Sequence, residues 1–394
     1  MIGLAELSMN HERTQFDFDS IIDRRHTGAV KWDRFRDRDI IPMWVADMDF
    51  ASPPCVIDAI RMRASHGVFG YTDPPDALNP TICSEMKREF GWIVEPEHLV
   101  WLPGLVTALN LVCRAIGNEG DEIITATPIY PPFLTAPVNQ QRQVIRVQML
   151  ERDGTWHWDF DALQRAITPR TRLLLLCNPH NPVGRVFNRD ELIRIATICE
   201  QHNLVVCSDE IHCGLMLDAG KTHVPLAALS AEVAKRTITL MAASKTFNVP
   251  GLGCAFAVVS DSQLRAQLKQ AAAGIVPRVG TLGFEGTLAA YRDGHAWRYA
   301  LLDYLRSNRD RVFQVINAIP GLKTWPVEAT YLAWIDVREL ELPDPIRFFE
   351  DAGVGLYNGA DFGTPGFVRL NFACPRALLD TALERIRSAV TTLP

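Results

Sequence analysis

Short, almost wholly apolar segments alternate with longer amphipathic segments from about residue 99 onward, and this alternation restricts the fold more than any other feature. Apolar runs of this length indicate strands buried on both faces, and the segments between them are long enough for helices, as over residues 189–202. The pattern predicts an α/β domain whose mostly parallel sheet is covered by helices on both faces. The expected strands are 122–126, 143–149, 172–177, 204–208, 237–241 and 253–260.

Polar clusters follow three of these strands directly. They are Asn-Pro-His-Asn-Pro-Val-Gly at 178–184, Ser-Asp-Glu-Ile-His at 208–212 and Ser-Lys-Thr-Phe-Asn at 244–248. In open α/β sheets, ligands bind outside the carboxyl ends of the strands. The three clusters therefore mark the expected position of a ligand site.

Each cluster also has a purely structural interpretation. The 178–184 segment has the proline and glycine residues of a turn. Asp209 can cap the first turn of a helix, and Lys245 can be an exposed lysine in a turn. Taken singly, the clusters leave both interpretations open.

The order and spacing of three polar residues favour chemistry over structure. Asp209 follows Asn181 by 28 residues, and Lys245 follows Asp209 by a further 36. A desolvated lysine amine can form an imine, a carboxylate can keep a pyridine nitrogen protonated, and an asparagine amide can donate to a phenolate oxygen. Pyridoxal 5′-phosphate (PLP) requires these groups, so we expect PLP as the cofactor.

The sequence pattern changes in the C-terminal third, and the new pattern predicts a second, smaller α+β domain. A long helical segment is expected at 284–319, followed by strands at 331–337 and 367–372 and helices at 345–351 and 375–390. We expect an N-terminal segment at 1–50 that packs with the small domain, a large PLP-binding domain at 51–290 and a small domain at 291–394.

Composition excludes several other classes of protein. The net charge of −6 does not indicate the basic surface that nucleic-acid-binding proteins have. No apolar stretch approaches the roughly 20 residues that span a bilayer. The nine cysteines form no Cys-x-x-Cys pair and are odd in number, which favours reduced packing cysteines over disulfides or a metal site. Met1–Asn10 lacks the basic region of a signal peptide. We expect a cytoplasmic protein with no metal, nucleic-acid or membrane partner.

Longer motifs resemble fold-type I PLP enzymes of the aminotransferase class I/II superfamily. Within it, they are most similar to the cystathionine β-lyase (C–S lyase) family of MalY/PatB type, and the resemblance runs from about residue 16 to 390. It implies the type I PLP-dependent transferase fold, with a mostly parallel seven-stranded sheet in the large domain. The matching motifs are Asp-Arg-Arg at 23–25 with Val-Lys-Trp at 30–32, Pro-Met-Trp-Val-Ala-Asp-Met-Asp-Phe at 42–50, Phe-Gly-Tyr at 69–71, 179–185, 208–212, 244–248 and Phe-Val-Arg-Leu-Asn at 367–371.

The resemblance implies roles for individual residues. Lys245 would carry the cofactor as a Schiff base, Asp209 would pair with the pyridine nitrogen, and Tyr130 would stack on the ring. Asn181 and His212 would lie near the ring oxygen, and Tyr71 would reach the phosphate of a neighbouring subunit, which implies a homodimer with composite sites. Arg369 would bind the substrate carboxylate, and Asn181, Ala46 and Trp44 would also contact the substrate. The turn at 103–106 begins a helix whose first N–H groups, at Gly104, Leu105 and Val106, suit a phosphate.

Two positions depart from the pattern of related enzymes. Many of them place a serine three residues before the lysine and a cation eight residues after it, where this chain has Ala242 and Gly253. Ser244 is expected to contribute to the phosphate site instead. Trp44, Phe133 and Trp334 are open to two interpretations, as lining of the substrate pocket or as core.

The resemblance to the cystathionine β-lyase family implies the activity. We expect α,β-elimination from L-cystathionine or a related cysteine S-conjugate, which yields a thiol, pyruvate and ammonia. The alternative is a class I/II aminotransferase acting on an L-amino acid, because the same residues serve both reactions. A PLP-binding regulator would need a DNA-binding module that the chain lacks before Asp23. A nicotinamide dehydrogenase is disfavoured because Gly251-Leu252-Gly253 precedes a strand instead of following one.

Overall fold

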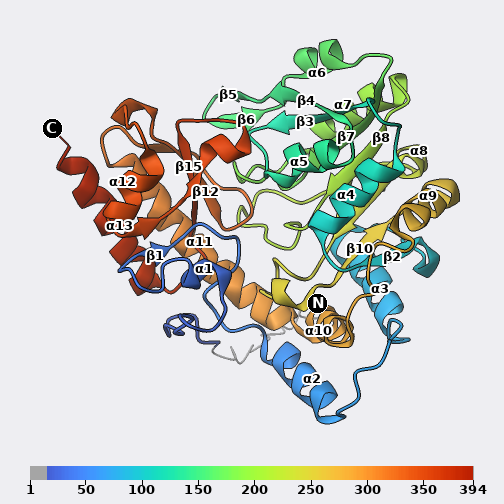
Figure 1. Ribbon diagram of the computed structural model, residues 1–394, viewed down its shortest axis with the longest axis horizontal. Coiled ribbons are helices and arrows are strands. Elements are labelled where there is room, and N and C mark those ends of the chain that lie inside the picture. Colours follow the sequence, from blue (N-terminus) through green and yellow to red (C-terminus); the bar gives the residue numbers. More distant parts are fainter. Residues whose placement is uncertain (1–15, 394) are drawn as a thin grey trace, which may run out of the picture.

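The structure, a computed structural model, describes residues 16–393. The expectation about Met1–Asn10 therefore lies outside the described residues. Two sheets dominate the molecule, a large one in the middle of the chain and a small one near its C-terminus (Figure 1).

The large sheet has seven strands, as expected, in the order β2-β10-β9-β8-β7-β3-β4. The five strands from β9 to β4 are parallel, and β10 runs antiparallel to both of its neighbours. The six predicted strands are confirmed, whereas the short edge strand β2 was not among them. The strands are β2 (Leu99–Leu102), β3 (Glu122–Thr127), β4 (Gln143–Gln148), β7 (Thr171–Cys177), β8 (Val205–Asp209), β9 (Thr237–Met241) and β10 (Ala255–Val258).

Helices cover both faces of this sheet because successive side chains of each buried strand point to opposite sides. In β7, Leu173 and Leu175 pack with α4 (Leu105–Ala115), α5 (Pro132–Asn139) and α9 (Ser262–Ala272). Leu174 and Leu176 pack on the other side with α6 (Phe160–Ala166) and α7 (Arg189–Gln201). This double burial explains why the strands are continuous apolar runs in the sequence.

The smaller unit is built on an antiparallel four-stranded sheet in the order β11-β12-β15-β14. The first strand of the described residues, β1, pairs in parallel with β13 of this unit, so the N-terminal segment packs beside it (Figure 1). The predicted strands and helices of this region are confirmed to within one or two residues. Its elements are β1 (Ile41–Pro42), β11 (Lys323–Thr324), β12 (Leu332–Asp336), α12 (Pro345–Asp351), β13 (Val354–Gly355), β14 (Tyr357–Asn358), β15 (Phe367–Asn371) and α13 (Arg376–Thr391).

The helical segment expected over 284–319 is confirmed, but it consists of two helices. The structure has α10 (Thr281–Asp293) and α11 (His295–Asn317), separated at Gly294. A side chain at Gly294 would collide with the Ala290 carbonyl and would lie 2.8 Å from the ring of Phe247, so this close packing requires glycine. Helix α11 then contributes to a core shared with both units. The proposed domain boundary at residue 290 lies near this break and remains a prediction.

The remaining helices and strands lie outside the two main sheets. They are α1 (Val30–Asp33), α2 (Pro54–Ser65), α3 (Leu78–Phe90), the hairpin β5 (Leu150–Arg152) and β6 (Thr155–His157), and α8 (Ala231–Lys235). Between residues 16 and 393, no helix combines the length and the apolar character needed to cross a bilayer. The same residues form no group of three or more side chains suited to a metal ion.

Candidate active site

A cavity of about 420 Å³ lies where the carboxyl ends of β7, β8 and β9 meet the small sheet. It receives side chains from parts of the sequence that are far apart. The predicted site residues that line it are Trp44, Ala46, Gly104, Leu105, Val106, Tyr130, Asn181, Asp209, His212, Ser244, Lys245 and Arg369. All the predicted site residues except Tyr71 are therefore brought to one cavity.

Lys245 reaches this cavity from the turn that follows β9. Its Nζ donates to the backbone carbonyl of Ala46 at 2.6 Å. Burial lowers the pKa of the Lys245 amine to about 8, and the Arg369 guanidinium acts in the same direction, while the carboxylates of Asp47 and Asp209 oppose it. A larger fraction of this amine is therefore neutral near neutral pH than for an exposed lysine.

Asp209 is the last residue of β8, and its side chain is buried. Its Oδ1 accepts from the N–H of Ile211 at 3.1 Å, within a turn that does not continue as a helix. The helix-cap interpretation is therefore not supported. Burial raises the pKa of Asp209 to about 7, and the neighbouring Glu210 adds to this shift, whereas the Ile211 N–H and Lys245 oppose it. A cationic group beside Asp209 would stabilise its charged form.

Arg369 lies on β15 of the small sheet and is almost fully buried. Its Nη1 donates to Asn181 Oδ1 at 3.0 Å, and its Nη2 donates to the carbonyl of Trp44 at 2.8 Å. The guanidinium also lies 5.1 Å from the ring centroid of Tyr357. Burial lowers the pKa of Arg369 to about 10. Such a fixed, desolvated guanidinium suits bidentate binding of a carboxylate.

The first turn of α4 presents backbone N–H groups to the same cavity. Gly104 precedes the helix, and Leu105, Val106 and Thr107 form its first turn. The helix dipole and these N–H groups favour an anion such as a phosphate. Ser244 lines the cavity as well, whereas Ala242 and Gly253 bring neither a hydroxyl nor a cation.

Unpartnered polar atoms at the cavity are consistent with a bound polar group. His212 Nδ1 and Arg369 Nε are buried without a hydrogen-bond partner among residues 16–393. Burial, with the nearby cations Lys245 and Arg369, lowers the pKa of His212 to about 3, so this imidazole is neutral. An amine, a carboxylate, an imidazole and an anion-binding helix end in one cavity fit PLP. The predicted stacking of Tyr130 on the ring remains a prediction.

One predicted site residue, Tyr71, and two residues that were open to two interpretations lie elsewhere. Tyr71 is 98% exposed and does not line this cavity, so its predicted role in a neighbouring subunit remains a prediction. Phe133 and Trp334 are fully buried in core clusters, which settles their two interpretations in favour of packing.

Sequence reasoning missed Val30, Thr107 and Tyr357, which also line the cavity. Thr107 had a signal, because it follows the Gly104 turn in the first turn of a predicted helix. Tyr357 lies beside Arg369 in the antiparallel pairing of β14 and β15, and this pairing could not be known before the small sheet was defined.

The fold and this cavity define the class of PLP enzymes with a mostly parallel seven-stranded sheet, and comparisons with known proteins identify the family. The sequence profile of aminotransferase class I and II matches residues 38–386, and the chain belongs to this family. The chain is 35% identical over 390 residues to cystathionine β-lyase PatB of Bacillus subtilis, covering 95% of this chain and 100% of that protein.

Two solved structures extend this similarity to the fold. The crystal structure of OvoB superposes with a TM-score of 0.94 at 45% identity, covering 96% of this chain and 100% of that one. Cystalysin from Treponema denticola, whose structure contains PLP, superposes with a TM-score of 0.93 at 31% identity, also covering 96% of this chain and 100% of its own.

Proposed function

We propose that this protein is a PLP-dependent carbon–sulfur β-lyase of the cystathionine β-lyase type. Its substrate would be L-cystathionine or a related cysteine S-conjugate, and its products a thiol, pyruvate and ammonia. The observation that carries the proposal is the convergence of Lys245, Asp209 and Arg369 on one cavity. The similarity to PatB over nearly the whole chain favours the lyase over the aminotransferase.

In this proposal, the cofactor is held by residues from both sides of the cavity. Lys245 would bind it covalently, Asp209 would pair with its ring nitrogen, and Asn181 and His212 would lie near its ring oxygen. The first turn of α4, with Ser244 and Thr107, would hold its phosphate. When bound, PLP supplies a ring that withdraws electrons and so stabilises negative charge at the substrate Cα.

In this proposal, the side chains of the protein bind and orient the substrate and move its protons. Arg369 fixes the α-carboxylate of the substrate and thereby sets the orientation of the amino acid in the cavity. With the substrate in the cavity, the neutral amine of Lys245 would remove the proton from Cα, a task favoured by its lowered pKa. The Cβ–S bond then breaks, and the thiolate leaves and takes up a proton. The remaining three-carbon enamine is hydrolysed by water to pyruvate and ammonia.

We also propose that the chain acts as a cytoplasmic homodimer. An exposed segment with large apolar side chains at Val68, Phe69 and Tyr71 supports the dimer, because such surfaces favour protein contacts. Nine free cysteines support a reducing compartment.

The test incubates the purified protein, loaded with PLP, with L-cystathionine and no added keto acid. The proposal predicts that pyruvate and a free thiol form continuously. An aminotransferase would instead leave the cofactor in its aminated form after a single turnover and would require a keto acid to continue. L-Alanine, which has no leaving group on Cβ, is the matched control and should yield no sustained pyruvate.

A further inference from the structure

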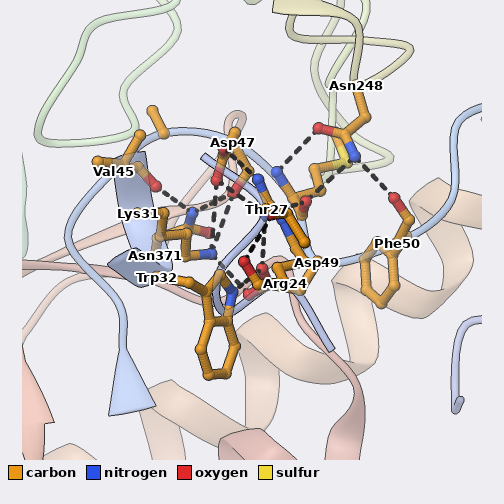
Figure 2. Close-up of polar contacts among 12 residues, drawn as sticks. Arg24, Thr27, Lys31, Trp32, Val45, Asp47, Asp49, Phe50, Asn248 and Asn371 are labelled. Atoms are coloured by element: carbon orange, nitrogen blue, oxygen red, sulfur yellow. Dashed lines mark hydrogen bonds and ion pairs between the residues drawn. The ribbon is translucent and has the colours of Figure 1, made fainter. Parts of the chain in front are cut away.

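A short segment, residues 44–50, crosses the edge of the cavity between the two sheets, and we call it the strap. Figure 2 shows how polar side chains hold it from both sides. From the large domain, Asn248 Nδ2 donates to the carbonyls of Met48 and Phe50, and its Oδ1 accepts from the Met48 N–H at 2.9 Å. From β15, Asn371 Nδ2 donates to the carbonyls of Val45 and Asp47.

The residues that hold the strap are close in sequence to the two main residues of the site. Asn248 lies three positions after Lys245, and Asn371 lies two positions after Arg369. The strap also contacts both of these residues directly. The carbonyl of Ala46 accepts from Lys245 Nζ at 2.6 Å and from the Tyr331 hydroxyl at 3.0 Å. The carbonyl of Trp44 accepts from Arg369 Nη2 at 2.8 Å. The strap therefore joins the base and the carboxylate-binding residue through its own backbone.

A buried charged cluster fixes the far end of the strap. The Asp49 carboxylate accepts from Lys31 Nζ at 2.7 Å, Arg24 Nη1 at 2.7 Å and Trp32 Nε1 at 2.8 Å. Asp49 is 3% exposed and Lys31 is 1% exposed. Arg24 also pairs with Asp47 at 2.8 Å, so two strap carboxylates share one guanidinium (Figure 2). Burying charged groups costs free energy even when they are paired, so added stability does not by itself account for this cluster.

We propose that Asp49 is a positioning residue for substrate binding. Through Lys31, Arg24 and Trp32 it fixes the strap, and the strap carbonyls orient Arg369 toward the substrate carboxylate and hold the amine of Lys245 when that amine is free. Asp49 itself does not line the cavity. The inference rests on the proposed function in one respect, namely that the ligand of the cavity is an amino acid.

The experiment compares Asp49→Asn with Glu122→Gln in the PLP-loaded protein. Both changes replace a buried, ion-paired carboxylate with an amide of the same shape. Glu122 lies at the amino end of β3, away from the strap, and bonds to Arg170 and to the hydroxyls of Thr168 and Thr171. The probe is glycine, an amino acid with no group to eliminate, and its binding is followed through the absorption of the cofactor. Hydrogen exchange of residues 43–50 is measured on the same variants without PLP.

Asp49→Asn is expected to weaken glycine binding about tenfold, the loss expected when a hydrogen bond to a charged group is misplaced. It is also expected to speed exchange at Met48 and Asp49, whose N–H groups bond to Asn248 and Ala373. Glu122→Gln should leave both readouts at their wild-type values even if it lowers the melting temperature. Unchanged glycine binding in Asp49→Asn, or an equal loss in Glu122→Gln, would overturn the proposal.

A second variant keeps the test decisive if Asp49→Asn does not fold. Asn248 has a φ of 54°, which glycine adopts without strain, so Asn248→Gly removes the contacts to the strap and leaves the backbone intact. It is expected to weaken glycine binding in the same way, and wild-type binding in this variant would overturn the proposal. Because glycine binding needs no leaving group, the result is independent of whether wild type cleaves L-cystathionine.

Discussion

Arg369 Nη1 donates to Asn181 Oδ1 at 3.0 Å, although the two residues are 188 positions apart. The bond joins β15 of the small sheet to the turn that follows β7 of the large sheet. Asn181 is held in turn by its own carbonyl, which accepts from the N–H of Tyr130 at 3.2 Å. The orientation of the proposed carboxylate-binding residue thus depends on a residue expected beside the cofactor ring.

Replacing Arg369 by lysine tests this arrangement. Lysine keeps the positive charge but lacks the planar guanidinium. It therefore cannot donate to Asn181 and at the same time bind a carboxylate through two hydrogen bonds. We expect KM for L-cystathionine to rise about 10- to 100-fold, with a smaller change in kcat. Steady-state kinetics measure the changes in KM and kcat separately. The matched control is Arg338→Lys, which changes an exposed guanidinium paired with Asp336. A KM equal to that of wild type would contradict the assignment.

The raised pKa of Asp209 predicts how the stability of the PLP-free protein depends on pH. Because the folded-state pKa of about 7 exceeds that of the unfolded chain, the folded state binds more protons between these values. The free energy of unfolding should therefore fall as the pH rises from about 4 to 7, by on the order of 2 kcal/mol relative to Asp209→Asn.

Thermal unfolding of both PLP-free proteins across this pH range measures the difference. Bound PLP should reduce it, since a protonated ring nitrogen beside Asp209 stabilises the carboxylate. Parallel stability curves for wild type and Asp209→Asn would show that this carboxyl is not desolvated.

The lowered pKa of Lys245 predicts the pH dependence of cofactor uptake. Only the neutral amine attacks an aldehyde, so the rate at which the PLP-free protein binds PLP covalently should rise with pH around a midpoint of about 8. Stopped-flow absorption at several pH values gives this midpoint. A midpoint near that of an exposed lysine, about 10.4, would mean that Lys245 is not desolvated.

Much of the site followed from the sequence because its residues lie at the ends of buried strands. Asp209 and Lys245 follow β8 and β9 directly, and the ends of parallel strands meet at one edge of the sheet. Contacts that depend on tertiary packing could not be predicted in this way. Predicting the break at Gly294 would have required the position of the Phe247 ring. Predicting the place of Tyr357 would have required the pairing of the two short strands β14 and β15. The edge strand β2 was missed because its place in the sheet depends on its antiparallel pairing with β10, which is distant in the sequence.

Mixing two variants tests the proposed composite site at Tyr71. If Tyr71 serves the cavity of the partner subunit, Tyr71→Ala and Lys245→Ala homodimers are each impaired. A dimer of one subunit of each kind has one site with both residues intact. We expect activity to appear when the two inactive proteins are dissociated and reassembled together, up to about half of the wild-type value per mixed dimer. Lys245→Ala mixed with Asp209→Asn is the control and should remain inactive, because both residues line the cavity of one chain.

The most direct test of the account is to locate the covalent cofactor. The PLP-loaded protein is treated with borohydride, which converts the bond between PLP and its lysine to a stable amine, and is then digested for peptide mass analysis. The account predicts that the label lies on Lys245, and that Lys245→Ala takes up none. A label on another lysine, or an unlabelled wild-type protein, would contradict the assignment of this cavity as the active site.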